Sequence, residues 1–112
     1  VANYYTGMLV SVALFADELN GATPADVHRV LDTRYADEPF VHVAPVNATD
    51  SLHHGYLNPT ACNGTNELQL LIFGDTQRTI INARYDNLGK GASGAAVQNL
   101  NIMLGLNEEL GL

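Results

Sequence analysis

A glycine-rich stretch near the C-terminal end holds the residues whose types and spacing are best suited to chemistry. It runs from Asp86 to Gly94 and reads Asp-Asn-Leu-Gly-Lys-Gly-Ala-Ser-Gly. Exposed backbone amides at a glycine-rich helix start attract anions, and Lys90 adds a positive charge there. The spacing fits neither the phosphate-binding loop of nucleoside triphosphatases nor the Gly-x-Gly-x-x-Gly pattern of dinucleotide-binding proteins. The residues alone therefore leave two interpretations open, a ligand-binding turn and a plain packing turn.

The remaining reactive side chains are isolated in the sequence. Cys62 lies in a predicted loop, and no base or positive group that could activate its thiol is close to it in the sequence, so we expect a plain free thiol. His53 and His54 are adjacent, so their side chains point apart on an extended chain, and no further ligand follows at zinc-like spacing. His28 and His42 have no motif partner. The sequence therefore predicts no metal site.

The length, charge and cysteine content of the chain argue against several classes of function. The chain has 112 residues, with 12 acidic against 5 basic residues and a formal charge of −7. That length fits one domain. The few, scattered basic residues argue against nucleic acid as a partner, and no apolar run reaches the roughly 18 residues that would span a membrane. One cysteine excludes an internal disulfide. Because Val1 is not a methionine, we expect a fragment or a processed product.

Two strands and a helix are predicted in the N-terminal part. Residues 8–15 read Met-Leu-Val-Ser-Val-Ala-Leu-Phe, which is largely apolar on both faces of an extended chain. We therefore expect a central strand that is covered on both sides. Thr23 as N-cap, followed by Pro24, predicts a helix start, and this helix should end before Pro39. Residues 40–43 read as a short strand.

The predicted helix carries electrostatic and packing signals of its own. Asp26 lies in the first turn, near the positive end of the helix dipole. Four apolar residues recur at helical spacing and form a stripe that we expect to be buried: Val27, Val30, Leu31 and Tyr35. The charged residues off this stripe are expected to face solvent.

The middle of the chain predicts a loop and an antiparallel hairpin. Residues 47–66 are polar and irregular, so we expect a long loop there, with a short strand near Tyr56 and Leu57. Residues 68–73 and 78–85 read as two strands, because four polar or small residues join two apolar runs. One face of the second strand should meet polar surroundings, since it carries Ile80, Asn82 and Arg84.

A helix of small residues is expected over residues 91–105, where Gly105 is a natural C-terminal stop. Gly94 inside it costs about 1 kcal/mol relative to alanine, so some group must approach it closely. The predicted fold class is α+β, with a mixed, mainly antiparallel sheet and helices packed on one face. The sequence shows no internal repeat.

The segment from Asp86 to Asn101 resembles the end of the N-acetyl-γ-glutamyl-phosphate reductases. The family pattern there is Asp-Asn-Leu-x-Lys-Gly-Ala-x-Gly-x-Ala-x-Gln-x-x-Asn, and every fixed position is matched. Residues 5–10 and 35–41 resemble two further sequence segments of that family. A shorter form of the pattern occurs in aspartate-semialdehyde dehydrogenases, so a segment of that enzyme stays open as an alternative. The continuation from Gln98 to Asn101 favours the arginine-biosynthesis enzyme.

The resemblance implies reductive dephosphorylation of an acyl phosphate with NADPH. The family's catalytic cysteine lies in a Gly-Cys-Tyr-Pro motif and its histidine in a His-Arg-His-x-Pro-Glu motif, and this chain contains neither motif. Cys62 does not match that cysteine, so no catalytic residue is expected in this chain and the segment alone should be inactive. Many relatives have Arg-Gly where this chain has Thr6-Gly7, which leaves open any phosphate role of that arginine.

By resemblance, residues 1–112 are a segment of the C-terminal substrate and oligomerisation domain of a glyceraldehyde-phosphate-dehydrogenase-like fold. The resemblance implies that Asn87, Lys90 and Gly91 lie near NADP, which is bound mainly by chain outside this segment. Asp86 would fix the loop by hydrogen bonds. Gln98 and Asn101, three apart on one helical face, could contact the other half of the enzyme or cap buried groups, and structural use is favoured.

The same resemblance implies which partners the chain has. The helix over residues 91–105 would pack back on the nucleotide-binding part, so an isolated chain should expose the stripe Ala92, Ala96, Leu100 and Met103. We expect pairing with that N-terminal part, homo-oligomerisation, an acyl-phosphate substrate and a cytoplasmic location. A non-enzymatic oligomerisation or binding module that kept the same sheet is the other function class left open.

Overall fold

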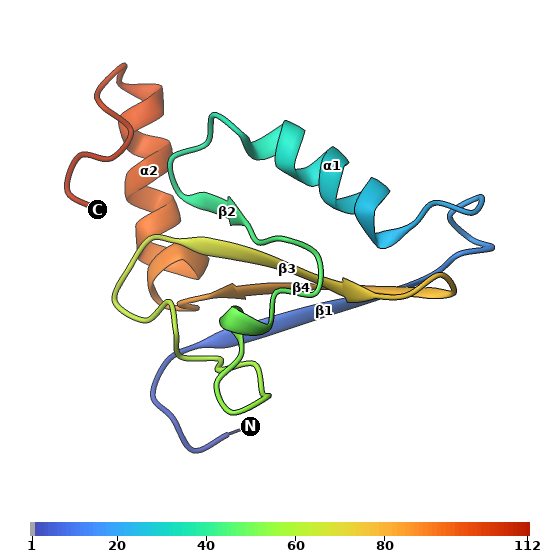
Figure 1. Ribbon diagram of the computed structural model, residues 1–112. Coiled ribbons are helices and arrows are strands. Elements are labelled where there is room, and N and C mark those ends of the chain that lie inside the picture. The colour runs from blue at the N-terminus through green and yellow to red at the C-terminus, as the bar shows by residue number, and fades with distance from the viewer. Residues whose placement is uncertain (1) are drawn as a thin grey trace.

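The computed structural model describes residues 2–112 and contains one four-stranded sheet with two helices. The elements in chain order are β1 (Met8–Phe15), α1 (Pro24–Tyr35), β2 (Val41–Val43), the 3-10 turn η1 (Thr49–Ser51), β3 (Leu68–Gly74), β4 (Arg78–Tyr85), the π-helical turn η2 (Gly89–Ser93) and α2 (Gly94–Met103). The strand order is β1-β4-β3-β2. Only β2 and β3 are parallel, and the other pairs are antiparallel. Both helices lie on one side of the sheet (Figure 1), so the expected α+β class is confirmed.

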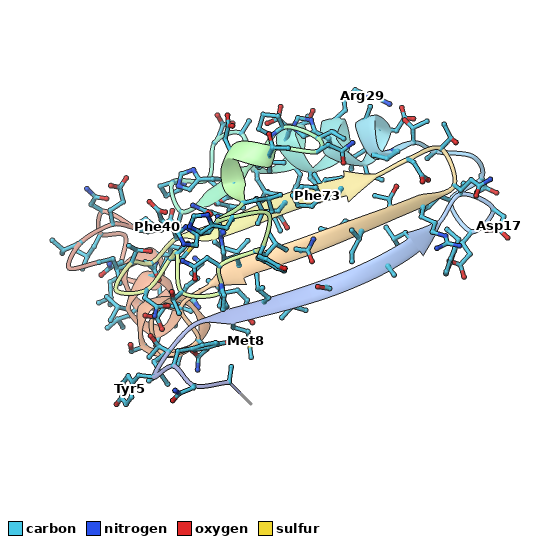
Figure 2. The ribbon with its side chains drawn as sticks, turned by 60° about the horizontal axis from the view of Figure 1, so that its bottom comes forward. Tyr5, Met8, Asp17, Arg29, Phe40 and Phe73 are labelled. Carbon is cyan, nitrogen blue, oxygen red and sulfur yellow. The ribbon has the colours of Figure 1, made fainter. Side chains whose placement is uncertain are left out.

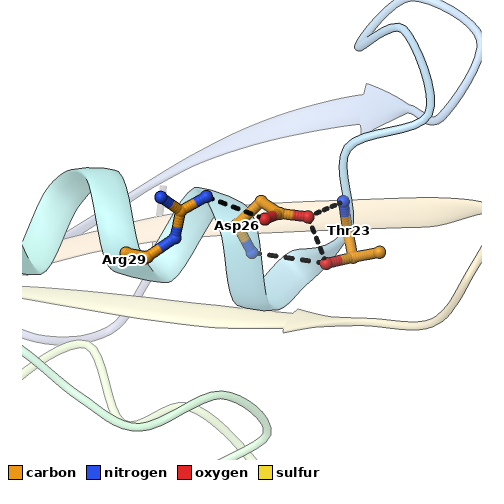
Figure 3. Close-up of polar contacts among 3 residues, drawn as sticks. All are labelled: Thr23, Asp26 and Arg29. Atoms are coloured by element: carbon orange, nitrogen blue, oxygen red, sulfur yellow. Dashed lines mark hydrogen bonds and ion pairs between the residues drawn. The ribbon is translucent and has the colours of Figure 1, made fainter.

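The start of α1 follows directly from three side chains (Figure 3). The Asp26 backbone N–H donates to Thr23 Oγ1 at 3.3 Å, and the Thr23 N–H donates to Asp26 Oδ2 at 3.0 Å. This reciprocal capping box satisfies two amides that the first helical turn leaves free. Hydrogen bonds from Thr23, with a further one from Arg29, lower the pKa of Asp26 to about 2. The predicted helix start is confirmed, and α1 ends before Pro39 as expected.

The apolar stripe of α1 is less buried than its spacing predicts. Val27, Leu31 and Tyr35 are half-buried, but the side chain of Val30 is 62% exposed, so the prediction for Val30 is wrong. α1 contacts β2 and β3, and the space between α1 and Ile81 of β4 is an apolar cavity of about 270 Å³. Helical periodicity identifies the face that turns toward the sheet, but not how closely the sheet approaches it.

The best-buried part of the sheet is β3. Leu70, Leu71 and Ile72 are buried there, and Cys62 from the long loop joins them. β3 has this environment because it lies between β4 and β2, with α1 on one face. The core of this chain is therefore small and centred on one strand.

β1 is an edge strand, so the prediction of a central strand covered on both sides is wrong. It pairs only with β4, and six of its eight residues are exposed. Figure 2 shows β1 along the open edge of the sheet, with Met8 at one end. Val10 is 43% exposed and Val12 is 48% exposed on one face. Apolar residues on both faces predict that a strand will be covered, but not whether its own chain covers it.

The long loop covers the sheet face opposite the helices (Figure 1). Arg84 is buried there: its Nε and Nη2 donate to Gln69 Oε1, and its Nη1 donates to the carbonyls of Ser51 and Asn58. The polar face expected on β4 therefore meets backbone carbonyls of the loop. The short strand expected near Tyr56 is reduced to one bridge between His53 and Tyr56.

The C-terminal helix begins and ends two residues earlier than the predicted range 91–105. Its first turn is π-helical, over Gly89–Ser93, and α2 proper covers Gly94–Met103. Gly105 has a φ of +66° and ends the helix as predicted. Gly94 is buried against Asn66 of the loop, and a Cβ on Gly94 would collide with Asn66 Oδ1. The close approach that Gly94 requires is thus made by this chain itself.

None of the helices among residues 2–112 is long and apolar enough to cross a membrane.

Candidate functional site

The candidate site is the turn between β4 and α2, and Asp86 organises it. Asp86 Oδ1 accepts hydrogen bonds from the N–H groups of Leu88 at 2.9 Å and Gly89 at 3.2 Å. Its Oδ2 accepts from the Gly64 N–H at 2.9 Å, which ties the long loop to the turn. These backbone donors, that of Gly64 first, lower the pKa of Asp86. The expectation that Asp86 fixes the loop by hydrogen bonds is confirmed.

Several backbone amides of the glycine-rich turn are already hydrogen-bonded within this chain. Backbone amides at such a helix start can bind an external anion, but here the carboxylate of Asp86 accepts from two of them. Two further amides are also satisfied within the turn, because Gly91 donates to the Asp86 carbonyl and Ser93 to the Leu88 carbonyl. The carboxylate of Asp86 therefore occupies part of the position that an external anion would take at this turn.

Asp86→Asn should remove part of the acid sensitivity of folding. The pKa of Asp86 is lower in the folded chain than the value of about 3.9 of an unfolded aspartate, so its contribution is fully present above about pH 4. That contribution is lost as pH falls through the lower folded pKa. Thermal unfolding from about pH 2 to about pH 7 should show a lower Tm for the variant at neutral pH and a smaller loss of Tm in acid.

Asp75→Asn is the matched control for this measurement. Asp75 also has a lowered pKa, caused by the backbone N–H groups of Gln77 and Arg78, but it lies in the exposed hairpin turn. We expect a smaller loss of Tm for that variant. An Asp86→Asn curve that follows the unmodified chain at every pH would contradict the role given to Asp86.

Asn87 uses only one of its two side-chain polar atoms within the described residues. Its Oδ1 accepts the Gly7 N–H at 2.8 Å, and within residues 2–112 its Nδ2 makes no hydrogen bond. The side chain is half-buried, beside the exposed Leu88. Asn87 therefore offers a fixed, neutral hydrogen-bond donor at the surface of this chain.

Lys90 lies in the same turn but contacts different segments. Its Nζ donates to Gln98 Oε1 at 2.5 Å and lies 5.3 Å from the centre of the Phe40 ring. Burial lowers the pKa of Lys90, and the nearby carboxylates of Glu108 and Glu38 oppose that change. Asn87 contacts the segment that leads into β1, whereas Lys90 contacts α2 and the segment before β2. The two predicted site residues thus share a turn and no common contact.

Gly91, the third predicted site residue, packs against the ring of Tyr85. A Cβ there would lie 3.0 Å from Cε2 of the Tyr85 ring. The turn lies close to that ring, so a side chain at this position would require the ring to move by a few tenths of an ångström. Within residues 2–112, Gly91 makes no hydrogen bond with Asn87 Nδ2.

Gln98 and Asn101 hold the C-terminal tail against α2. Gln98 Nε2 donates to Glu108 Oε1 at 2.5 Å. The buried Asn101 donates through Nδ2 to the carbonyls of Glu108 at 3.1 Å and Leu110 at 2.9 Å. The favoured structural use of Gln98 and Asn101 is confirmed. Sequence reasoning missed Glu108 as the partner of both side chains, and Gly7 as the partner of Asn87, because no local spacing links residues that meet only after folding.

Cys62 has the environment of a structural thiol. Its side chain is fully buried, and burial raises its pKa, although Arg84 opposes that change. A thiolate nucleophile needs the opposite conditions. His53 and His54 are exposed, with their rings edge to face, and no group of three metal-ligating side chains occurs among residues 2–112.

The outer face of the C-terminal helix is apolar and uncovered. Leu100 is 53% exposed and Met103 is 83% exposed. Ala92 and Ala96, on the same stripe, are also exposed. The predicted exposed stripe is therefore confirmed. Exposed apolar surface of this kind marks a contact face.

Comparison with known proteins gives consistent matches. Residues 1–87 match the family model described as semialdehyde dehydrogenase, dimerisation domain. N-acetyl-gamma-glutamyl-phosphate reductase 2 of Nostoc sp. is 49% identical over 116 aligned positions, covering 100% of this chain and 36% of the relative. The reductase of Trichormus variabilis is 47% identical with the same coverage, and that of Brucella ovis is 42% identical over 94% of this chain and 34% of the relative.

This chain therefore spans about a third of the length of these relatives. The matched family model covers β1 to β4 and ends at Asn87, at the start of the turn, before α2. Since that model matches well over half of the sequence, the chain belongs to the semialdehyde dehydrogenase dimerisation-domain family.

Proposed function

We propose that this chain is the C-terminal part of an NADPH-dependent N-acetyl-γ-glutamyl-phosphate reductase of arginine biosynthesis. The observation that carries this proposal is the match over the whole chain, at 47–49% identity, to two reductases of that name. The enzyme would act in the cytoplasm on an acyl phosphate. The segment alone would be inactive, because its one thiol, Cys62, is buried and burial raises its pKa.

The turn supports a contact with the nicotinamide end of the cofactor rather than with its phosphates. Asp86 accepts from two amides of the turn, those of Leu88 and Gly89, and Lys90 Nζ contacts Phe40 and Gln98. Asn87 offers one neutral donor, which suits the carboxamide group of nicotinamide. The cofactor supplies the hydride of the reaction. In this proposal Asn87 orients the ring, whereas Lys90 and Gly91 shape the turn beside it.

Two apolar surfaces suit two different partners. β1, with Val10 and Val12 exposed, lies within the residues that match a dimerisation domain, so this strand would face a second copy of the protein. The exposed stripe of α2 lies beyond the matched residues. In this proposal it packs on the nucleotide-binding part of the same enzyme.

A joined protein tests the proposal. The nucleotide-binding part of the Nostoc sp. relative, followed by residues 1–112, is called the joined reductase below. We expect residues 1–112 alone to give no turnover. The joined reductase should reduce NADP⁺ with N-acetylglutamate semialdehyde, and only when inorganic phosphate is present, because phosphate is needed to form the acyl phosphate.

The substrate in this assay separates the alternatives. Turnover of aspartate semialdehyde in place of N-acetylglutamate semialdehyde would instead support the alternative that this chain is a segment of an aspartate-semialdehyde dehydrogenase. A well-folded joined reductase that neither binds NADPH nor turns over would support a binding module without enzyme activity.

A further inference from the structure

The segment that leads into β1 reaches the candidate site and fixes one of its side chains. The Gly7 N–H donates to Asn87 Oδ1 across 80 positions of sequence. Because a backbone N–H can only donate, the atom that it meets must be the amide oxygen. The orientation of the Asn87 amide is thereby determined, and Nδ2 is the atom left to donate to another molecule.

Gly7 is itself held in place by the long loop. It has a φ of +123°, and a Cβ there would lie 2.5 Å from the Pro59 carbonyl oxygen. The preceding Thr6 carbonyl accepts a hydrogen bond from Asn63 Nδ2 at 2.9 Å. The next residue of this loop, Gly64, donates to Asp86. The loop therefore contacts the segment around Gly7 through Pro59 and Asn63, and the start of the turn through Gly64.

We propose that Gly7 is a positioning residue, which holds the Asn87 amide so that Nδ2 faces the cofactor. This inference rests on the proposed function, in which Asn87 donates to the nicotinamide group. A free asparagine side chain would present its oxygen and its nitrogen to the carboxamide in either orientation. The Gly7 N–H excludes the orientation of the Asn87 amide in which Oδ1 would face the cofactor. Because the side chain is already ordered, binding the cofactor costs less conformational entropy.

Gly7→Ala in the joined reductase is the first test. The new Cβ meets the backbone of Pro59 and the φ of +123° disfavours any side chain, so the backbone at Gly7 must shift, which disturbs its hydrogen bond to Asn87. We expect the Kd for NADPH to rise about tenfold or more. The Kd for adenosine 2′,5′-bisphosphate, which lacks nicotinamide, should stay unchanged. Gly55→Ala is the matched control, because Gly55 has a φ of +83° and nothing lies within 4 Å of its Cβ.

Asn63→Ala is a second variant that keeps the test valid if Gly7→Ala fails to fold. It removes only the hydrogen bond to the Thr6 carbonyl, and we expect the Kd for NADPH to rise about threefold. A folded Gly7→Ala that keeps the original Kd, or that loses affinity for both ligands equally, would overturn the inference. If Asn87→Asp nevertheless weakens NADPH binding, the proposed function stands and only the role of Gly7 falls. If Asn87→Asp has no effect either, the proposed contact of Asn87 falls as well.

Discussion

Asn87→Asp is expected to weaken NADPH binding to the joined reductase by about ten- to a hundredfold while the protein stays folded. The carboxylate of the variant can still accept the Gly7 N–H, so the link between the turn and the segment before β1 remains. It cannot donate, and so it loses the contact offered to the nicotinamide carboxamide. Fluorescence titration with NADPH measures the effect.

Lys90→Ala is the matched control in the same turn. Lys90 contacts Gln98 and the Phe40 ring, so its loss should affect stability more than cofactor binding. We expect less than about a threefold change in the Kd for NADPH. A large loss of affinity in Lys90→Ala together with none in Asn87→Asp would reverse the roles assigned to the two residues and restore the phosphate-binding interpretation of the turn.

The second large effect is expected at β1. Val10→Asp combined with Val12→Asp places two carboxylates on an exposed apolar face within the matched dimerisation residues. Burying unpaired charges in an apolar contact costs several kcal/mol. The dimer dissociation constant should therefore rise at least about a hundredfold. Sedimentation of the joined reductase over a concentration series measures this change.

The α2 stripe supplies the comparison for this prediction. Leu100→Asp combined with Met103→Asp introduces the same number of charges on a surface that lies beyond the matched residues. We expect this variant to remain dimeric and to lose activity, because its helix no longer packs on the nucleotide-binding part. A dimer that survives the β1 substitutions but dissociates with those on α2 would show that the two surfaces had been assigned to the wrong partners.

Local signals were sufficient to predict most helices and strands of this chain, but not the π-helical turn over Gly89–Ser93. Thr23, Pro24 and Asp26 specify the start of α1 through groups within one helical turn, and the structure shows each contact that the spacing implies. The hairpin and the stop at Gly105 likewise depend on neighbours in sequence. Propensities and caps act over a few residues, so one sequence is enough to recognise them.

Long-range features could not be predicted in the same way. The apolar faces of residues 8–15 indicated that the strand needs cover, but strand order places β1 at the edge. The glycine-rich turn left a ligand-binding and a packing interpretation open, and the sequence did not indicate that two of its amides donate to the carboxylate of Asp86. The Gly7 contact that orients Asn87 joins residues far apart in sequence and leaves no periodic signal.

The most direct test is a crystal structure of the joined reductase with NADPH bound. The account predicts that Asn87 Nδ2 lies about 2.7–3.2 Å from the oxygen of the nicotinamide carboxamide, with Oδ1 still accepting the Gly7 N–H. A cofactor whose phosphates contact the backbone amides of the turn, with its nicotinamide beyond the reach of Asn87, would contradict it.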